Sequence, residues 1–317
     1  MSSSGLSVRT STIDSLEQLR ETVHGADLDV VQLQPGQLEG VLTHVTSPSL
    51  ACSVGRFSRG IRSRGVFSRE NITLWLLVDR AAKVTEWSHE MEAGNLVSIP
   101  PGADHEGLYL GPTRYVALSL RPSDLADAFG ADSALSDPGC WAVRQLWRSA
   151  PVVGRRELDY LTSIVSGLAG QADLSVQAGD FWQRSIVELF AFVVASALPA
   201  ERLDTVQSAA RLVRDVERFV DEHTPGPLHV SDICRALNVS RRSLYRAFEE
   251  VTGIGAMTFL RRKRLSRVHV ELRRAAGEGQ SVTKLALENG FAELGRFSRQ
   301  YWALFGEFPS ETLRRRH

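Results

Sequence analysis

The chain has 317 residues, 43% of them hydrophobic and 23% charged, which is too long for one small core and suits two folded domains. Lys and Arg balance Asp and Glu at 37 each, and a net charge of zero taken alone would argue against binding to nucleic acid. The charge is divided unequally, however, because residues 205–317 carry 20 basic and 13 acidic residues (+7) and the remainder carries 17 and 24 (−7). A basic part joined to an acidic one is typical of a phosphate-binding domain attached to a domain that does not bind phosphate.

The cysteines and the apolar runs limit where the chain can work. Cys52, Cys140 and Cys234 lie far apart and form no CxxC spacing, which argues against a disulfide framework or a zinc cluster and favours a reducing compartment. The first residues contain no apolar signal core, and the longest apolar run, residues 186–198, includes a glutamate and is too short to span a bilayer. We therefore expect a cytoplasmic protein that does not enter a membrane.

The first part of the chain has the pattern of an antiparallel sheet, at about residues 30–122. Short stretches rich in Val, Ile, Leu and Trp, at 71–78, 95–99 and 115–120, are separated by turns that contain Gly and Pro. This pattern predicts strands folded into a sandwich or barrel. The polar residues 1–30 are expected to be frayed at their start.

Helices are predicted from residue 123 onward, where Ser123 is placed to cap the first of them. The predicted segments are 124–129, 141–148, 155–169 and 181–197. Residues 200–207 resemble a linker. We therefore expect a first domain over 1–199, with its β part at about 30–122 and its helical part at about 123–198, and a second domain over 208–317.

The second domain is predicted to be entirely helical. Apolar residues at helical spacing indicate a first helix that ends at Pro225-Gly226-Pro227 and a long central helix that contains Leu265 and Leu272. Helix-turn-helix units are predicted on either side of the central helix, at 228–248 and 281–301, and Pro309 helps to start a final short turn.

The first unit has the chemistry of a DNA-reading helix. Asn238 is expected to end the supporting helix because it tolerates left-handed backbone, and Val239 is expected to be buried in the turn. Ser240 then caps a second helix, on which Leu244 and Phe248 point inward. The residues expected to point outward are Arg241, Arg242, Tyr245 and Arg246. A short helix that is buried on one face and carries Arg and Tyr on the other suits a DNA major groove.

The pattern then repeats. Leu285 corresponds to Ile233 at an offset of 52 and Phe297 corresponds to Leu244 at an offset of 53, so the second turn is one residue longer. Two such units joined by one long helix predict contact with two half-sites about 10 base pairs apart, in successive major grooves roughly 34 Å apart. The basic run 261–264 between them has two interpretations, a phosphate-contacting surface or the solvated face of an amphipathic helix.

These residues resemble the AraC family of bacterial transcription regulators over about 208–316. The matching segments are 239–248, 252–253, 259–265, 289–291, 297–299 and 304–310. The resemblance implies promoter binding by both units, usually for activation, with double-stranded DNA, RNA polymerase and a second copy of the chain as partners. Within the family, the ending at 305–310 and the Arg-rich central helix are most similar to the ethanolamine-operon regulators.

The resemblance also implies which residues face DNA. The expected contacts are Arg241, Arg242, Tyr245, Arg246, Leu294, Arg296, Ser298 and Arg299. Leu294 and Gly295 depart from the polar base-readers common at these positions of the family, and neither can form a bidentate base contact. We therefore expect the second unit mainly to position the protein through Arg296 and Arg299.

Residues 94–105 resemble the second half of a cupin motif and the sensor domain of the same family. In a cupin enzyme this His joins a His-x-His pair and a Glu on a metal, whereas Trp87-Ser88-His89 supplies one His where two are wanted. Because ligand count is the first test of a metal site, we expect no metal, no cofactor and no catalytic residues. A poor ligand set of His89 and His105, with Glu90 or Glu92, is the alternative.

An aromatic-lined pocket for a small-molecule effector is the preferred interpretation of this domain. The candidate lining and orienting residues are Arg56, Trp75, Trp87, His89, His105 and Tyr109. The competing interpretation makes the tryptophans ordinary core residues. Likewise, the apolar face of helix 181–197, with Phe181, Trp182, Phe190 and Phe192, either pairs with a second copy or packs only on its own domain.

Taken together, the sequence predicts an α+β protein, with an N-terminal cupin-like β-barrel and helical segment before a C-terminal all-α domain that has two helix-turn-helix units. We predict a sequence-specific, DNA-binding transcription regulator that is not an enzyme, responds to an effector as an activator and forms a homodimer. Two alternatives stay open: a metal-dependent cupin enzyme fused to a DNA-binding module, and a constitutive regulator whose N-terminal domain is purely structural.

Overall fold

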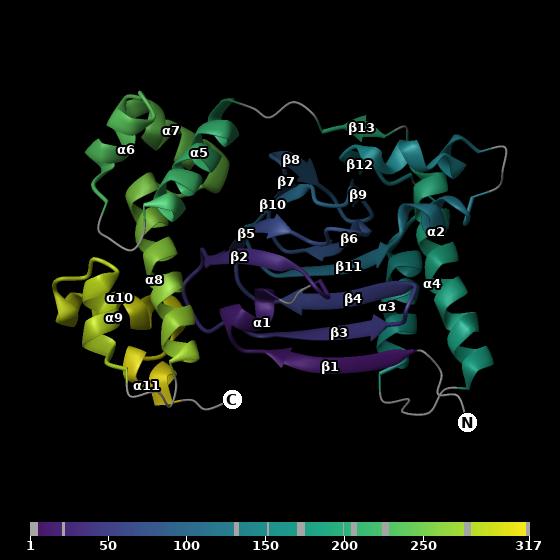
Figure 1. Ribbon diagram of the computed structural model, residues 1–317, viewed down its shortest axis with the longest axis horizontal. Coiled ribbons are helices and arrows are strands. Elements are labelled where there is room, and N and C mark those ends of the chain that lie inside the picture. The colour runs from purple at the N-terminus through teal and green to yellow at the C-terminus, as the bar shows by residue number, and fades with distance from the viewer. Residues whose placement is uncertain are drawn as a thin grey trace. The chain divides into compact units, whose positions relative to one another are not determined.

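The computed structural model describes residues 6–20, 23–129, 133–150, 152–169, 175–198, 200–203, 208–223, 228–275 and 280–314. The chain divides into two compact units, whose elements are labelled in Figure 1. The first unit takes Met1–Asp29, Glu39–Ser58 and Ser63–Asp204, and the second takes Val30–Leu38, Arg59–Arg62 and Thr205–His317. Two short segments from early in the chain therefore belong to the second unit.

Antiparallel strands dominate the first unit. In chain order the strands are β1 (Ser7–Ile13), β2 (Asp27–Gln32), β3 (Gly40–Thr46), β4 (Leu50–Phe57), β5 (Ile61–Val66), β6 (Ile72–Arg80), β7 (Val84–Glu86), β8 (His89–Met91), β9 (Leu96–Ile99), β10 (Asp104–Tyr109), β11 (Thr113–Leu120), β12 (Gln145–Trp147) and β13 (Glu201–Arg202). One sheet has eight strands in the order β1-β3-β4-β11-β6-β9-β12-β13, and the other has five in the order β2-β5-β10-β7-β8. Strands β2 and β5 each belong partly to the first unit and partly to the second.

These sheets correct one part of the predicted fold. The mixture of antiparallel sheet and helices, followed by a helical part, is confirmed. The described strands nevertheless form two sheets that share no strand, and neither sheet closes on itself into a barrel. The cupin-like character of this unit therefore stays a prediction from the motif at residues 94–105.

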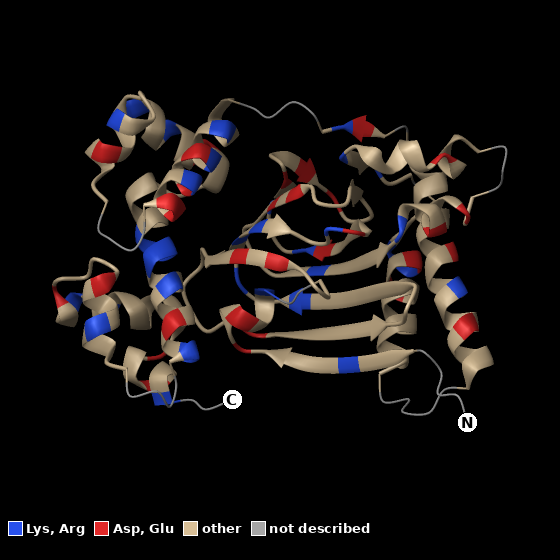
Figure 2. Ribbon diagram, in the orientation of Figure 1, with Lys and Arg blue, Asp and Glu red and all other residues tan. Residues whose placement is uncertain are grey.

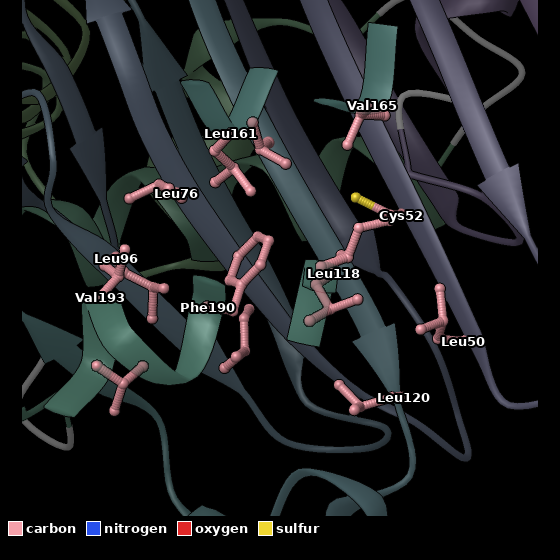
Figure 3. Close-up of a cluster of buried hydrophobic side chains, with 14 of the residues drawn as sticks. Leu50, Cys52, Leu76, Leu96, Leu118, Leu120, Leu161, Val165, Phe190 and Val193 are labelled. Atoms are coloured by element: carbon pink, nitrogen blue, oxygen red, sulfur yellow. The ribbon is translucent and has the colours of Figure 1, made fainter. Parts of the chain in front are cut away.

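The core of the first unit lies between the eight-stranded sheet and two helices. The helices of this unit are α1 (Leu16–Arg20), α2 (Pro122–Ala126), α3 (Arg155–Gly167) and α4 (Val176–Ser196), with short 3-10 turns η1 (Ala134–Ser136) and η2 (Pro138–Ala142). Cys52 of β4 and Leu118 of β11 are register partners and are fully buried. Figure 3 shows Leu161 of α3 and Phe190 of α4 on the same side of the strands as these residues, in one buried cluster. Because each buried aliphatic or aromatic side chain contributes about 1.5–3 kcal/mol, this layer holds both helices on the sheet.

Three of the predicted strands, at 71–78, 95–99 and 115–120, are confirmed as β6, β9 and β11. The helix predicted over 141–148 is wrong, because η2 ends at Ala142 and β12 then pairs with β9. Strand β1, within the segment expected to be frayed at its start, was not predicted. It pairs along its whole length with β3.

The helix starts also differ from the prediction. Arg121 occupies the N-cap position of α2, and the hydroxyl of Ser123, expected to cap that helix, contacts the Asp124 carboxylate instead. Helix α4 begins at Val176, because the Ser175 hydroxyl accepts the backbone N–H of Ala178 at 3.2 Å. Local capping therefore moves the start of α4 toward the N-terminus.

The apolar face of α4 is only partly used within its own unit, and pairing with a second copy stays a prediction. Phe190 is fully buried in the core of its own unit, and Trp182 packs against that core. Phe181 is 61% exposed and Phe192 is 43% exposed. Part of this helix is thus used within the unit, and part is open to solvent.

The second unit is helical over its described residues beyond 208, as predicted. Its helices are α5 (Ser208–Glu222), α6 (Val230–Ala236), α7 (Arg241–Thr252), α8 (Ala256–Arg274), α9 (Val282–Glu288), α10 (Leu294–Phe305) and α11 (Pro309–Arg314). The Pro225-Gly226-Pro227 segment, predicted to end the first helix, lies outside the described residues, as do residues 204–207 of the predicted linker. The described part of that linker includes strand β13, which pairs with β12.

The two early segments of the second unit are held to its helices by polar contacts. The Gln32 side-chain amide donates to the carbonyl of Leu304 at 2.7 Å, and the backbone N–H of Gly36 donates to the same carbonyl at 3.0 Å. Arg62 and Glu217 form an ion pair at 2.7 Å in which their side chains are 2% and 1% exposed. These contacts connect residues more than 150 positions apart in the sequence.

Candidate nucleic-acid interface

The first helix-turn-helix, α6 and α7, has the local geometry that the sequence predicted. Asn238 has a φ of +51° and ends the supporting helix in left-handed backbone. The Ser240 hydroxyl accepts the backbone N–H of Ser243 at 3.0 Å and caps α7. Leu244 and Phe248 are fully buried, whereas Val239, expected to be buried in the turn, is only half-buried.

The outer face of α7 is cationic and unpaired. Its predicted DNA contacts, Arg241, Arg242, Tyr245 and Arg246, are all exposed. Among the described residues, no ion pair or hydrogen bond holds any of the three guanidinium groups. By contrast, Arg218 of α5 pairs with Asp215 and Arg235 of α6 pairs with Asp232. Free, exposed guanidinium groups on one short helix suit contacts with phosphates and with guanine edges.

The second helix-turn-helix, α9 and α10, repeats the backbone bonding of the first. The N–H of Val239 donates to Cys234, and the N–H of Phe291, 52 positions later, donates to Ala286, both at 2.9 Å. Gly290 has a φ of +79° at the position that corresponds to Asn238. From α7 onward the offset is 53, because the first bonds of α7 and α10 correspond at that spacing. The longer second turn is thus confirmed.

The outer face of α10 carries fewer free cations than that of α7. Arg296 and Arg299 are exposed, Gly295 is exposed, and Leu294 and Ser298 are half-buried. Arg296 lies 3.9 Å from the Glu293 carboxylate, and the Arg299 Nε donates to the carbonyl of Gly295 at 3.4 Å. This helix therefore offers two basic side chains, each with a weak contact in its own turn.

A buried polar network that the sequence did not reveal fixes α10 on its neighbours. His269 of α8 contacts the Tyr301 hydroxyl of α10 at 2.7 Å, and that hydroxyl contacts Thr312 of α11 at 2.8 Å. The Thr312 hydroxyl also donates to Glu307 at 2.6 Å. Tyr301 and Thr312 are fully buried, so the network gives α10 one defined orientation against α8 and α11.

The basic residues of α8 serve mostly the fold, so the run 261–264 is neither a wholly solvated helix face nor, in most of its members, a free phosphate-contacting surface. Lys263 is 7% exposed and its Nζ lies 3.0 Å from Asp221. The Arg264 guanidinium lies 5.3 Å above the Phe291 ring, and burial, followed by the charge of Arg261, lowers its pKa. Figure 2 shows the blue segments along α8. In the described structure, Arg261 is the member of the run 261–264 that has no ion pair, hydrogen bond or ring contact.

The candidate ligand residues of the first unit fall into two groups. Trp75, Trp87, His105 and Tyr109 are buried, at 2%, 1%, 2% and 4% exposure. Trp75 lies 5.7 Å from Tyr109 between ring centroids, and the Tyr109 hydroxyl donates to Glu86 at 2.8 Å. Burial and the Glu86 carboxylate raise the pKa of Tyr109 well above its usual value. His89 is half-buried and contacts the carbonyl of Trp87, whereas Arg56 is exposed.

The same region holds the alternative metal ligands. Glu90 and Glu92, which the alternative joined to His89 and His105, both pair with Arg80. His105 Nδ1 lies 3.1 Å from the carboxylate of Glu86, a residue that the metal hypothesis did not include. In the described part of the chain, no three His, Cys, Asp or Glu side chains gather as metal ligands would. Nor does any helix of that part have the length and apolar character to cross a membrane.

Comparisons with known proteins locate the similarity in the second unit. A family model described as a helix-turn-helix domain matches residues 233–315. The chain is 36% identical over 98 residues to the XylDLEGF operon transcriptional activator 2 of Pseudomonas putida, which covers 31% of this chain and 62% of that protein. It is 27% identical over 104 residues to the regulatory protein SoxS of Escherichia coli K12, which covers 33% of this chain and 94% of that protein.

A solved structure gives a longer but weaker match. The AraC-like transcriptional activator CuxR is 17% identical, with a TM-score of 0.41, over 89% of this chain and all of that one. The chain covers 62% and 31% of the length of two Pseudomonas putida activators that it matches. Residues 233–315 thus form a helix-turn-helix domain that is related to the DNA-binding domains of transcription regulators.

Proposed function

We propose that the whole chain is an AraC-family transcription regulator, an activator that binds its promoter through α7 and α10 and responds to a small-molecule effector. The observation that carries this proposal is the repeated helix-turn-helix, whose backbone bonds recur at offsets of 52 and then 53 residues. The similarity of residues 233–315 to the domains of known regulators supports it. A single helix-turn-helix would be a weaker argument, because this short motif occurs in many proteins.

The joining helix supports contact with successive grooves. Helix α8 has 19 residues, which gives a length of about 28 Å at 1.5 Å per residue. Recognition helices that enter successive major grooves on one face of DNA are separated by about 34 Å. A helix of this length between the two helix-turn-helix elements is compatible with half-sites about 10 base pairs apart.

The two recognition helices have different roles in this proposal. In α7, Arg242, Tyr245 and Arg246 read bases, because their free polar groups match base edges in the major groove. In α10, Arg296 and Arg299 bind phosphates and Leu294 contacts a thymine methyl. Ser298 and Arg241 add polar contacts to the DNA backbone.

The remaining parts of the proposal concern the first unit and the partners. The exposed Phe181 and Phe192 of α4 support a homodimer, since apolar side chains at the surface favour an interface. The activator role implies contact with RNA polymerase and a cytoplasmic location. The likeness to ethanolamine-operon regulators stays a prediction from the sequence.

Replacement of Arg246 by Ala tests the placement of α7. The operator is first selected from random DNA with the unmodified chain, and binding is then measured by fluorescence anisotropy. We expect Arg246→Ala to weaken binding by about 1–3 kcal/mol, roughly 5- to 150-fold, and to relax the sequence preference at one position.

The matched control is Arg218→Ala in α5, an exposed arginine that is paired with Asp215. This change should leave the affinity within about twofold of that of the unmodified chain and the sequence preference unchanged, since surface substitutions away from a site have small effects. If no sequence is enriched, or if Arg246→Ala keeps the affinity and the preference of the unmodified chain, the proposed function is wrong.

A further inference from the structure

Two adjoining hollows in the first unit share the same pair of arginines. The larger has a volume of about 670 Å³ and the smaller of about 420 Å³, and both are lined by Arg56 and Arg114. They lie where β4 and β11 meet the start of α3. We refer to the two together as the arginine groove.

The strand register places two like charges side by side at the centre of the arginine groove. Arg56 of β4 is the direct partner of Arg114 of β11 in the antiparallel pair, so both side chains leave the sheet on one face. Like charges directly opposite each other destabilise a sheet. Such an arrangement suits an anion that both guanidinium groups contact.

The protein neutralises only part of this charge. Arg114 lies 2.5 Å from Asp159 of α3, and the same carboxylate lies 3.6 Å from Arg155. Arg80, which also lines the groove, is paired with Glu90 and Glu92. In the described part of the chain, Arg56 has neither an ion pair nor a hydrogen bond from its guanidinium. The carboxylates of Glu39 and Asp79 also line the larger hollow, and Asp79 of β6 is the register partner of Arg114. The cation left available to a ligand is therefore that of Arg56.

The groove also has apolar walls, because it lies at the end of the hydrophobic layer under α3. Cys52 and Val54 precede Arg56 on the same face of β4, and the apolar cluster ends there. Phe57 and Pro112 line the larger hollow, and Val41 and Val54 line the smaller one. Hydroxyl groups of α3 complete the smaller hollow, from Thr162, Ser163 and Ser166.

We propose that the arginine groove binds a small organic carboxylate with an apolar body. Its carboxylate bridges Arg56 and Arg114, since guanidinium groups bind carboxylates in a bidentate manner. Its apolar part packs on Phe57 and Pro112. The volumes fall in the range of small-molecule sites. Of the six residues that the sequence offered for an effector site, only Arg56 lines this groove.

The groove also has a physical connection to helix α3. A carboxylate that binds Arg114 competes with Asp159, which holds the first turns of α3 against the sheet. Ligand binding therefore exchanges a contact within the protein for a contact with the ligand. A role for this exchange in regulation rests on the proposed function, whereas the binding itself does not.

Isothermal titration of the full chain tests the proposal with phenylacetate, cyclohexanecarboxylate and hexanoate as probes. We expect saturable binding of at least one of these acids and no binding of phenylacetamide, which keeps the ring and lacks the charge. Arg56→Ala should weaken the binding at least about tenfold, and Arg56→Lys should weaken it less, because Lys keeps the charge without the bidentate geometry. Arg69→Ala, at an exposed arginine outside the groove, should change nothing.

Three results would overturn the proposal. These are the failure of all three acids to bind, equal binding of phenylacetamide, and carboxylate binding that survives Arg56→Ala. Inorganic phosphate is titrated as well, and phosphate binding without competition by the acids would also contradict it. Binding to the selected operator is measured on the ligand-free chain, so failure of the groove and failure of the DNA-binding function are distinguishable.

Discussion

Replacing Glu217 with Gln should destabilise the second unit far more than an exposed substitution on the same helix. The Arg62 Nε donates to the two Glu217 carboxylate oxygens at 2.8 and 3.0 Å, and the Arg62 Nη2 donates at 2.7 Å. The side chains are 2% and 1% exposed. Gln keeps the volume of Glu but replaces one of the two acceptor oxygens with an NH2 donor, so the change removes the negative charge and one acceptor and leaves a guanidinium buried without its counter-ion.

The magnitude follows from this burial. Breaking a buried ion pair by removing one partner costs about 3–5 kcal/mol, because the remaining charge has no compensation. The matched change on α5 is Asp215→Asn, which breaks a pair whose side chains are 31% and 61% exposed and should cost less than about 1 kcal/mol. Removing both charges, as in Arg62→Met with Glu217→Met, should be less costly than Glu217→Gln alone.

Hydrogen exchange of the α5 amides, followed by mass spectrometry, measures the effect locally, and urea unfolding of the full chain measures it globally. Exchange in α5 reports the opening of the second unit directly, which matters in a chain of two units. The reasoning would be refuted if Glu217→Gln lowered the free energy of unfolding no more than Asp215→Asn does. It would also be refuted if the destabilisation by Glu217→Gln disappeared in 1 M salt, because salt screens exposed ion pairs much more than buried ones.

Two further predictions concern cysteine chemistry and the glycines of α10. Burial raises the pKa of the Cys52 thiol from 9.0 to about 12, so the contribution of the buried neutral thiol to stability is complete below pH 9 and is lost as the pH rises toward 12. At pH 8, Ellman's reagent should therefore modify the half-buried Cys140 and Cys234 well before Cys52, and equal rates for all three would contradict this. Gly295→Ala should raise stability by up to about 1 kcal/mol, because Gly is a poor helix residue and nothing lies within 4 Å of the added Cβ. Gly306→Ala should lower stability by about 1–2 kcal/mol, because Gly306 has a φ of +75°. In thermal unfolding, a lower stability of Gly295→Ala would contradict the first argument and a higher stability of Gly306→Ala would contradict the second.

The two helix-turn-helix elements of the second unit were predictable because their determinants are local. A capping serine at 240, a left-handed residue at 238 and the spacing of Leu244 and Phe248 all act within one or two helical turns. The repeat then supplied an independent check, since the same features recur at Gly290 and Phe297. The capping residues, the left-handed residues and the apolar spacing therefore all predict the same local structure.

The parts that were missed depend on distant partners. Residues 141–148 have apolar side chains compatible with a helix, yet Gln145–Trp147 becomes a strand because β9 provides its hydrogen bonds. Strand β1 likewise exists because β3 lies beside it. The pairing of Arg56 with Arg114, 58 positions apart, follows from strand register, which a single sequence does not specify. Trp75 and Tyr109, which the sequence offered for the effector site, pack on each other in the core.

The two helices that we propose to contact DNA differ in how free their cations are and in how they are held by the rest of the domain. Helix α7 combines a side-chain cap at its start with three arginines that have no partner in the described structure, so its cations are available to base edges. Helix α10 has no side-chain cap, and its two arginines contact their own turn, but the buried contacts from Tyr301 to His269 and Thr312 tie it to two other helices. A helix that positions the protein on DNA needs a fixed orientation more than it needs base-reading side chains, because phosphate contacts set register without reading sequence. Changes at Arg242 or Arg246 should therefore alter which sequence is bound, whereas changes at Arg296 or Arg299 should weaken binding to all sequences alike and reduce its dependence on salt.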